Sequence, residues 1–598
     1  MIGSSTRGRT GGARRSATTG FRGATLVAVV VAMTTIGMLP GVAGAQTADD
    51  TTESGTLAWT DCAELDPQGT FAIECATLTV PVDHDEPDGP TLDLAVRRIA
   101  TDVDPSERLG SLVINPGGPG GPALGILPAM AASGLFAGWD LVAPDPRGVG
   151  DSAPLACEDA VPDPAPPEGN PFVDVDEANA DIIRACLASD GEVFSHLGTV
   201  TVAKDLDLLR DALGEDQLDY LGFSYGTHLG AVYADLFGDR VGRFVLDGPV
   251  LLDSVVDATL EQIAGFDDAI DRFDAGCAVE EQCVLADYGA RSVWRHLAWR
   301  LGEEPMSATI DDPALGVSGE FTVDTVTLDN ATALAIYVGR AYWGVFAQAL
   351  LDATWGDAEL LWTMSYLWDS GPYSAAAGLG VLCADDPDRS VGPTEAQQLT
   401  YQEILDGNTT WAFQIGAELS QCRVAPVSDE SVPDLSIAEG ETNPMLVIAK
   451  THDPATPYSG ALDFMEAVGP GRLLTVVDDG HTAVADGNTC VDATTVRFLA
   501  TGELPPEGAV CYPDGQVGVN IEPVEDGWAV LEVVPGSPAD GIVEPGDLIV
   551  AWNGEPVPPG PTVPPRIGDE VVLTLVRADA TLDVAVVVRP PAFWLPDD

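Results

Sequence analysis

A serine between two glycines constrains the fold of this chain more than any other feature. The stretch Gly222–Gly226 (GFSYG) follows the strand-like run 217–221 and opens the helix-like run 225–237. Glycine on either side of Ser224 lets a strand and a helix approach closely across a tight turn. The helix that begins there would place the Tyr225 amide at a helix N-terminus, which favours negative charge. This setting predicts that Ser224 is a nucleophile; a glycine-rich packing loop is the alternative.

Strand-like runs that end in glycine- or proline-containing loops recur along the chain. Alternating apolar residues over 76–100 predict an antiparallel hairpin, and 111–115 (SLVIN) and 140–143 (DLVA) are typical of the next strands. The same rhythm returns at 444–449 and 472–477. Strand, loop and helix in alternation predict an α/β sheet.

Two segments depart from this rhythm. Between 251 and 432 the pattern changes to long helix-like stretches that hold seven of the twelve tryptophans. Because sheet-like runs resume afterwards, we predict an inserted, mostly helical cap. Beyond Cys511, β-branched residues alternate with Gly and Pro turns and predict a separate small β-rich domain. The predicted boundaries are 1–45 for a leader, 46–56 for an acidic tether, 57–250 and 433–511 for the two parts of the core, 251–432 for the cap and 512–598 for the last domain.

The first 45 residues have the pattern of a secretory signal peptide. Arginines precede the apolar run Ala24–Leu39, and Ala43 to Ala45 (AGA) fits a cleavage site before Gln46. The apolar run has 16 residues and is interrupted by threonines, whereas a spanning helix needs about 20 residues. We therefore expect an exported chain, secreted or associated with the cell envelope, with no stable membrane span after cleavage.

The chain is strongly acidic. Its 94 acidic residues face 27 basic ones, five of which lie in the leader, and the only lysines are Lys204 and Lys450. Such a charge repels nucleic acid, so we expect no nucleic-acid partner. An acidic surface suited to a salty medium explains the excess better than binding of cationic substrates does.

Ten cysteines lie beyond the leader, and an even count in an exported chain indicates disulfides. Sequence does not fix their connectivity, although pairing of neighbours would close five local loops and is the arrangement that we favour. There is no C-x-x-C motif and no His/Cys cluster, so we expect neither a metal nor a cofactor. The cysteines are Cys62, Cys75, Cys157, Cys186, Cys277, Cys283, Cys383, Cys422, Cys490 and Cys511.

A serine hydroxyl needs a base that removes its proton. In a strand–turn–helix setting of this kind, the partners follow the serine in the order Asp, then His. His481 lies in a loop after the predicted strand 472–477 and is the expected base. His452 has no acid between it and Ser224 in the resumed sheet region, and His228, one helical turn beyond Ser224, is expected to be packed or solvated.

The acid that orients the imidazole is expected at the end of the preceding strand. Asp453 lies there, just beyond the strand-like run 444–449 and directly after His452. One alternative is Asp247, at the end of the strand that follows the helix after Ser224. Asp478 and Asp479 are the others, but they lie very near His481 along the chain. The order and roles of such a triad favour Asp453.

The oxyanion that forms during attack needs two donors. One is the Tyr225 amide, and the second is expected in the loop after 111–115, which faces the same site. Glycines 117 and 118 allow bare backbone to approach a substrate carbonyl. We predict that the Gly118 and Tyr225 amides form the pair, with an ordinary tight turn as the alternative.

Five short motifs follow one another in order: NPGGPGG at 115–121, DPRGVGDS at 145–152, GFSYGTHLG at 222–230, D-x-x-T-P at 453–457 and G-H-T at 480–482. As an ordered set they resemble the exported actinobacterial tripeptidyl and prolyl aminopeptidase-like α/β-hydrolases, which have a TAP-like C-terminal region. The resemblance covers roughly 57–511 and implies an α/β-hydrolase fold with an inserted helical cap. It also implies hydrolysis near the N-terminus of peptides through an acyl-enzyme, with Ser224, Asp453 and His481 as the triad.

Members of this family bind the free amine of the substrate with acidic residues of the cap. The resemblance therefore implies peptide substrates with a free N-terminus. In this sequence Glu280 and Glu281, between two cysteines, or Asp385 and Asp386, after Cys383, are candidates for the amine site. Ordinary solvated acids are the alternative in so acidic a chain.

The last domain resembles a PDZ module, through PGSPADG at 535–541 and GDLIVAWNGEPV at 546–557. PDZ domains bind peptide ends by strand addition beside a helix. The proline-rich run 558–565 lies where that helix belongs and cannot form a regular one. We expect a PDZ-like fold that binds a peptide or protein partner, or one that only packs against its neighbours.

Taken together, these features predict a secreted serine peptidase that releases N-terminal residues or short peptides. A carboxylesterase or lipase with the same triad is one alternative, because fold and triad do not fix the leaving group. A catalytically inert, peptide-binding envelope protein is another.

Overall fold

The structure is a computed structural model, and it describes part of the chain. The leader 1–45, the tether 46–56, Glu281 and the run 558–565 lie outside this part. The described residues are 57–62, 65, 70–157, 171–252, 255–280, 283–313, 315–369, 373–386, 422, 432, 435–438, 440–513, 519–524, 527–533, 539, 542–552, 555–557, 570–577 and 580–587.

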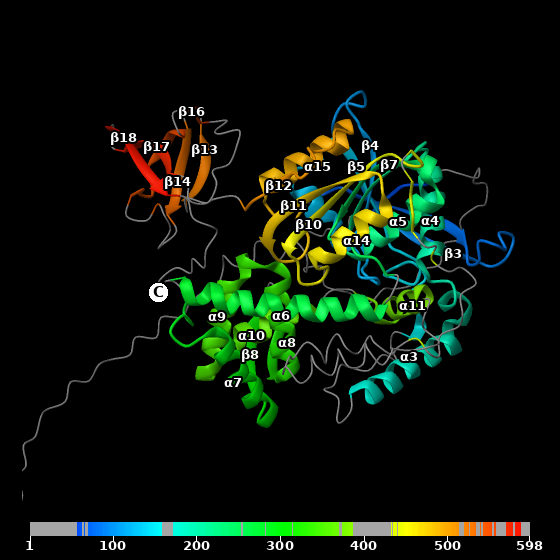
Figure 1. Cartoon of the computed structure of the whole chain (residues 1–598), viewed down its shortest axis with the longest axis horizontal. Coiled ribbons are helices and arrows are strands. Elements are labelled where there is room, and N and C mark those ends of the chain that lie inside the picture. The colour runs from blue at the N-terminus through cyan, green and yellow to red at the C-terminus, as the bar shows by residue number, and fades with distance from the viewer. Residues whose placement is uncertain are drawn as a thin grey trace, which may run out of the picture.

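One large mixed sheet forms the centre of the protein (Figure 1). Within the described part of the chain it has ten strands in the order β1-β2-β3-β5-β4-β6-β7-β10-β11-β12. The strands from β5 to β12 pair in parallel, and β1, β2 and β3 add an antiparallel edge. Their bounds are β1 Thr60–Asp61, β2 Ile73–Pro81, β3 Thr91–Ile99, β4 Gly110–Asn115, β5 Trp139–Pro144, β6 Leu218–Phe223, β7 Val241–Asp247, β10 Met445–His452, β11 Gly471–Asp479 and β12 Val510–Cys511.

Helices cover both faces of this sheet. Neighbouring strand residues point to opposite faces, so Leu112 packs in one core cluster with α2 and α15, whereas Val113 packs in another with α3, α4, α5 and α14. Helix α3 was not anticipated from the sequence. The bounds are η2 Ala123–Gly125, α2 Leu127–Ala132, α3 Pro171–Phe194, α4 Thr199–Leu213, α5 Tyr225–Leu236, η4 Gly238–Arg240, α14 Tyr458–Val468 and α15 Thr489–Thr501.

The chain leaves the sheet after β7 and returns at β10, which confirms the inserted, mostly helical cap. Figure 1 shows the cap in green beside the carboxyl-terminal part of the core. Trp343 and Phe346 lie at the centre of its own core. A two-stranded hairpin, β8 with β9, interrupts the helices and was not predicted. The elements are α6 Val255–Val279, α7 Ala290–Glu303, β8 Met306–Asp312, β9 Val317–Val323, α8 Thr325–Val338, α9 Arg340–Trp355, α10 Glu359–Asp369 and α11 Ala375–Asp385.

The C-terminal residues form a second, antiparallel sheet with a core of its own, as the β-rich pattern predicted. Its strand order is β13-β14-β15-β17-β18, and β16 pairs with β15. In Figure 1 this sheet is the orange-to-red unit. The likeness to a PDZ module stays a prediction. The bounds are β13 Val519–Val524, β14 Gly527–Val533, β15 Leu548–Trp552, β16 Glu555–Pro556, β17 Glu570–Arg577 and β18 Ala580–Val587.

Every cysteine is paired with its neighbour along the chain, the arrangement favoured from the sequence. The bridges close loops within the core, within the cap and near the end of the core, and each constrains the unfolded chain. No helix in the described ranges combines the length and the apolar character that a bilayer span requires. The pairs are Cys62–Cys75, Cys157–Cys186, Cys277–Cys283, Cys383–Cys422 and Cys490–Cys511.

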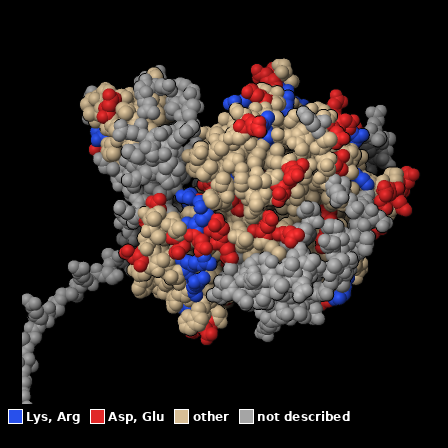
Figure 2. All heavy atoms as spheres, viewed as in Figure 1, with Lys and Arg blue, Asp and Glu red and all other residues tan. Residues whose placement is uncertain are grey.

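Acidic side chains are spread over the visible face of the molecule (Figure 2). On the cap, a group of basic side chains lies among them. This distribution agrees with the acidic surface expected from composition.

Candidate active site

Ser224 lies on a tight turn between β6 and α5. Its backbone has φ +54° and ψ −125°, a conformation that costs a non-glycine residue on the order of 1–3 kcal/mol. A Cβ on Gly222 would lie 2.5 Å from the Gly226 carbonyl oxygen, and one on Gly226 would lie 2.8 Å from Asn115 Oδ1. Both glycines are therefore required by close packing, and the turn holds Ser224 at the carboxyl end of a central parallel strand.

His481 and Asp453 form a buried pair. His481 Nδ1 lies 2.8 Å from Asp453 Oδ1 and 2.9 Å from Oδ2, and the side chains are 3% and 1% exposed. Asp453 Oδ1 also accepts hydrogen bonds from the Ala455 and Thr456 amides. Burial raises the pKa of Asp453, but the charge of His481 and these hydrogen bonds outweigh it, so the pKa lies below its ordinary value. An ionised Asp453 fixes Nδ1 as the protonated nitrogen.

The other imidazole nitrogen, His481 Nε2, is buried and has no hydrogen-bond partner among the described residues. The Tyr337 ring packs on the imidazole edge to face, with centroids 4.5 Å apart at 62°. The side chain of Tyr337 also interacts with that of Ser224. Ser224 and His481 thus lie against the same tyrosine, with no hydrogen bond between them. Such bonds are often long in ligand-free enzymes and tighten when substrate binds.

The glycine-rich loop after β4 passes directly beside the Ser224 turn. A Cβ on Gly117 would lie 3.0 Å from Ser224 Cβ and 3.1 Å from the Tyr225 nitrogen. The Gly117 amide donates to Asn115 Oδ1 at 2.9 Å. The Gly118 and Tyr225 amides donate to no other described residue. The two amides predicted for the oxyanion are therefore on adjacent backbone segments and available for a ligand.

Asp247, a rival for the orienting acid, has a different place. Its Oδ2 accepts hydrogen bonds at 2.8 Å from the amides of Ala483 and Val484, two and three residues after His481. Burial raises its pKa to about 6, although these amides lower it. Asp247 therefore holds the backbone of the loop that carries His481, whereas Asp453 contacts the imidazole.

Asp479, a second rival, is also occupied elsewhere. Its Oδ1 lies 2.5 Å from Arg272 Nε and its Oδ2 lies 2.5 Å from Arg340 Nε. Burial raises the pKa of Asp479, but the two guanidinium groups outweigh it and hold the pKa below its ordinary value. This carboxylate ties the loop of His481 to the cap.

The acids predicted to bind a substrate amine are not gathered at one place. Asp385 is buried and its Oδ1 accepts a hydrogen bond from the Thr199 amide at 2.9 Å. The Thr199 hydroxyl lies 2.5 Å from both Asp385 Oδ2 and the Tyr225 hydroxyl. Asp385 thus supports the start of α4 beneath Tyr225. Asp386 is buried next to it, and Glu280 follows α6 at the Cys277–Cys283 bridge; Glu281 lies outside the described residues.

The remaining histidine near the serine is packed, one of the two options expected. His228 is 1% exposed, and neither ring nitrogen has a hydrogen-bond partner in the described part of the chain. Burial lowers its pKa to about 4. His228 is therefore neutral at physiological pH.

Sequence reasoning missed two side chains at the site. Thr456 Oγ1 lies 3.4 Å from His481 Nδ1, and its place in the D-x-x-T-P motif was the available signal. Tyr337 contacts both Ser224 and His481 from the end of α8. Nothing in the sequence around Tyr337 marks it, because its place depends on how the cap packs on the core.

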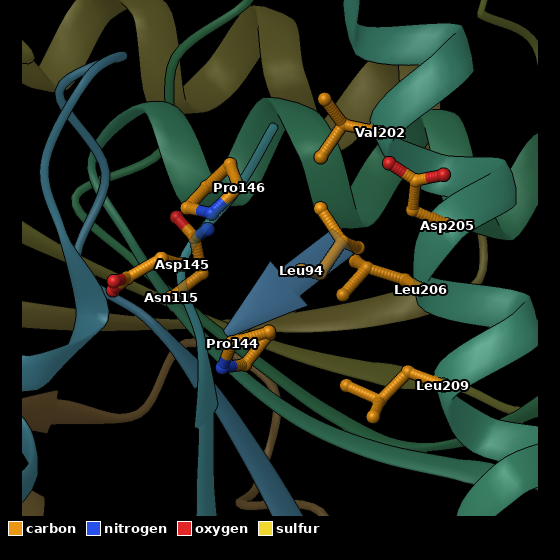
Figure 3. A pocket seen from close by; sticks show the side chains of 9 residues that line it. All are labelled: Leu94, Asn115, Pro144, Asp145, Pro146, Val202, Asp205, Leu206 and Leu209. Atoms are coloured by element: carbon orange, nitrogen blue, oxygen red, sulfur yellow. The ribbon is translucent and has the colours of Figure 1, made fainter. Parts of the chain in front are cut away.

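A small cavity lies between the sheet and α4, and Asn115 is among the residues that line it (Figure 3). Its volume of about 10 Å³ has room for roughly one water molecule. Asp205 at its edge forms an ion pair with Arg147 at 2.7 Å. The cavity is therefore part of the core and too small for a substrate.

The strained serine at the end of a parallel strand, beside a buried His–Asp pair, defines the class as the α/β hydrolases. Residues 110–299 match the alpha/beta hydrolase fold family, and residues 409–511 match the TAP-like protein family. The chain is 34% identical over 512 residues to "Serine protease Hip1" of Mycobacterium tuberculosis (strain ATCC 25618 / H37Rv), covering 80% of this chain and 96% of that protein. The chain therefore belongs to the TAP-like family of α/β hydrolases and is a serine hydrolase.

Two further relatives have different names. "Tripeptidyl aminopeptidase" of Streptomyces lividans is 32% identical over 480 residues, which cover 76% of this chain and 87% of that protein. "Carboxylesterase B" of Mycobacterium tuberculosis (strain CDC 1551 / Oshkosh) is 32% identical over 488 residues, 76% of this chain and 90% of that protein. Among solved structures, a proline iminopeptidase from Mycobacterium smegmatis matches at 16% identity, with a TM-score of 0.34, over 71% of this chain and 97% of that one.

Proposed function

We propose that the protein is an exported serine peptidase that removes residues or short peptides from the N-terminus of peptides, as tripeptidyl and prolyl aminopeptidases do. The observation that carries the proposal is the buried Asp453–His481 pair beside the strained turn of Ser224, in which His481 Nε2 has no partner among the residues that the structure describes. Relatives named as a serine protease and a tripeptidyl aminopeptidase support peptides as substrates.

In the proposed reaction the Ser224 oxygen attacks the scissile carbonyl while its proton passes to His481 Nε2. The Gly118 and Tyr225 amides donate hydrogen bonds to the oxyanion that results, and the start of α5 favours its negative charge. Asp453 stabilises the imidazolium that forms. His481 then gives the proton to the leaving amine, which departs and leaves an acyl group on Ser224.

Water completes the cycle. His481 Nε2 removes a proton from a water molecule as the water oxygen attacks the acyl carbon. The same two amides hold the second oxyanion, and the proton returns from His481 to the Ser224 oxygen as the acid leaves. Each group thus ends in its starting state, and no cofactor takes part in these steps.

The test compares three substrates on the full chain: a tripeptidyl p-nitroanilide with a free amine, the same compound acetylated at the amine, and a short p-nitrophenyl ester. We expect cleavage of the first, with loss of activity when the amine is blocked. We expect Ser224→Ala to lower turnover on the order of 10⁴-fold or more, and a fluorophosphonate probe to label the wild type but not this variant. A folded wild type that resists the probe would end the proposal and favour an inert peptide-binding protein.

An esterase is the second candidate, because one relative of similar identity is named a carboxylesterase and the triad alone does not select the leaving group. In the assay above, rapid cleavage of the ester with no cleavage of either anilide would favour this candidate. Cleavage of the acetylated anilide would instead indicate an endopeptidase.

We propose export on two grounds. The leader has the arrangement of a signal peptide, and the five bridges require an oxidising compartment to persist. Detection of the mature chain beginning at Gln46 in culture medium or at the cell wall tests the proposal of export.

For the C-terminal sheet we propose a PDZ-like fold that binds or packs against a peptide or protein partner.

A further inference from the structure

The junction between helices α8 and α9 of the cap lies against the loop that carries His481. It comprises residues 337–340, which end α8 and begin α9. The backbone carbonyl of Tyr337 accepts a hydrogen bond from the His481 amide at 2.7 Å. This bond fixes the backbone of the histidine from the cap side, in addition to the bonds that Asp247 makes on the core side.

The two backbones approach so closely that only glycine fits. A Cβ on Gly339 would lie 2.4 Å from the Asp479 carbonyl oxygen, and one on Gly480 would lie 2.9 Å from the Val338 carbonyl oxygen. Both glycines have positive φ, +84° and +99°. The contact between junction and loop is therefore a direct backbone contact with no side chain between the two segments.

The Tyr337 side chain adds a second restraint. Its ring packs edge to face on the imidazole of His481, and the Trp368 ring packs on the same tyrosine, with ring centroids 5.2 Å apart. Asp453 fixes only one nitrogen of the imidazole. A ring held at Nδ1 can still tilt, and the tyrosine ring removes that freedom on one face.

Two cap arginines add a third restraint through Asp479, two residues before His481. Arg272 of α6 contacts both carboxylate oxygens, and Arg340 of α9 contacts Oδ2. The carboxylate is nearly buried, with 2% of its side chain exposed. Two helices of the cap therefore hold one carboxylate of the histidine loop in a fixed place.

We propose that the α8–α9 junction, together with Arg272 of α6, is a positioning element of the active site: the Tyr337 ring sets the tilt of the His481 imidazole, and Arg272 and Arg340 fix the position of its loop through Asp479. The Tyr337 ring and the two arginines act through His481, so the proposal rests on its role as the base, whereas the Tyr337 hydroxyl is the group that interacts with Ser224. The α/β core supplies the three triad residues, and the cap completes their alignment.

The first experiment replaces Tyr337 and measures kcat and KM separately. Displacement of a catalytic group by about 1 Å can cost on the order of 100-fold in rate. We therefore expect Tyr337→Leu to lower kcat roughly 10- to 100-fold, with KM changed less than about threefold. Tyr337→Phe keeps the ring and is expected to retain most of kcat. Tyr366→Leu is the matched control, because Tyr366 stacks on Trp362 within the cap.

Three results would overturn this assignment. Wild-type kcat in Tyr337→Leu would show that the ring has no positioning role. Equal losses in Tyr337→Phe and Tyr337→Leu would assign the effect to the hydroxyl. A loss of kcat in Tyr366→Leu equal to that in Tyr337→Leu would show that the effect comes from general damage to the cap.

The second experiment is milder and guards against misfolding of the tyrosine variants. Arg340 has 38% of its side chain exposed, so Arg340→Gln is expected to fold. We expect this variant to lower kcat, the double variant with Arg272→Gln to lower it further, and Arg340→Lys to restore part of it. Arg300→Gln is the control, because Arg300 binds carbonyl groups within the cap. Unchanged kcat in the double variant would overturn the role of the arginines.

The wild type separates this proposal from the proposed function. If a fluorophosphonate labels wild-type Ser224 and peptide anilides are cleaved, the function stands whatever the Tyr337 variants do. If the wild type is not labelled, the proposed function is contradicted, and the positioning proposal, which rests on it, is contradicted with it. Labelling rates of all variants, with melting temperatures measured alongside, report on the nucleophile without requiring the correct peptide substrate.

Discussion

Asp247 accepts a hydrogen bond from the backbone amide of Ser224 at 2.9 Å. The carboxylate of the same residue accepts two hydrogen bonds from the amides of Ala483 and Val484. A single residue at the end of β7 therefore links the turn of the candidate nucleophile to the loop of the candidate base, His481. The link uses backbone groups on both sides, so it sets the distance between turn and loop independently of the side chains that react.

The first prediction concerns the pH dependence of stability. Burial raises the pKa of Asp247 from 3.8 to about 6. A carboxyl whose native pKa is raised stabilises the fold fully below its unfolded pKa, and this contribution is lost as pH rises through the native value. Asp247→Asn stays neutral and keeps an oxygen that can accept both hydrogen bonds. We expect its melting temperature, relative to wild type, to rise between about pH 4 and pH 6.

The control for this prediction is Asp247→Ala, which removes the acceptor. Leaving the two buried amides unpaired is expected to cost on the order of 2 kcal/mol or more in the free energy of unfolding at every pH. Melting temperatures at half-unit pH steps check both variants. A difference between Asp247→Asn and wild type that stays constant from pH 4 to pH 8 would contradict the assignment.

The second prediction concerns the orienting acid. Asp453→Asn preserves shape and can still accept from the Ala455 and Thr456 amides, so we expect a small change in melting temperature. Its amide no longer fixes Nδ1 of His481 as the donor, and kcat is expected to fall about 10⁴-fold. Asp268→Asn is a suitable control, because Asp268 is exposed near the other histidine of this region. Steady-state kinetics on a peptide anilide measure both; near-normal kcat in Asp453→Asn would refute the role.

Local chemistry explains what the sequence predicted well. The Ser224 turn needs two glycines within five residues, and the strand, turn and helix are contiguous in the chain. The whole motif can therefore be recognised from one short stretch of sequence. His481 and Asp453 follow in a fixed order after strands that are themselves visible as apolar runs. Neighbouring cysteines also pair, because each bridge closes within one segment or between adjacent ones.

Long-range packing explains what it did not predict. The place of Tyr337 depends on how α8 docks on the core, and no local pattern encodes that. The family resemblance implied Asp385 as a candidate amine ligand, which stays a prediction; what the sequence did not show is its contact with Thr199, 186 positions away along the chain. The β8–β9 hairpin does show the alternation of a strand, with Ala308 and Ile310 buried. It is short and lies among helices, so the sequence pattern of the segment as a whole predicted helices there.

The third prediction separates strain from chemistry at the serine. Ser224 has φ +54°, where alanine is as strained as serine and glycine is not. Both Ser224→Ala and Ser224→Gly are expected to be inactive. Ser224→Gly is expected to be more stable than Ser224→Ala by about 1 kcal/mol, because relief of strain exceeds the entropic cost of glycine. Denaturant unfolding of the two variants side by side measures the difference, and equal stabilities would mean that the turn is unstrained.

The fourth prediction tests whether the loop of the proposed oxyanion site must touch the serine turn. A Cβ on Gly117 would lie 2.4 Å from the Phe223 carbonyl oxygen, at φ +89°. Gly117→Ala is therefore expected to push the loop from Ser224 and to lower kcat on the order of 100-fold or more. Gly134→Ala is the matched control, since Gly134 also has positive φ, +68°, but no atom within 4 Å of the added carbon. That control carries the conformational cost alone, of about 1 kcal/mol in stability, and should keep its kcat. Equal kcat in the two variants would show that contact between loop and turn is dispensable for the reaction.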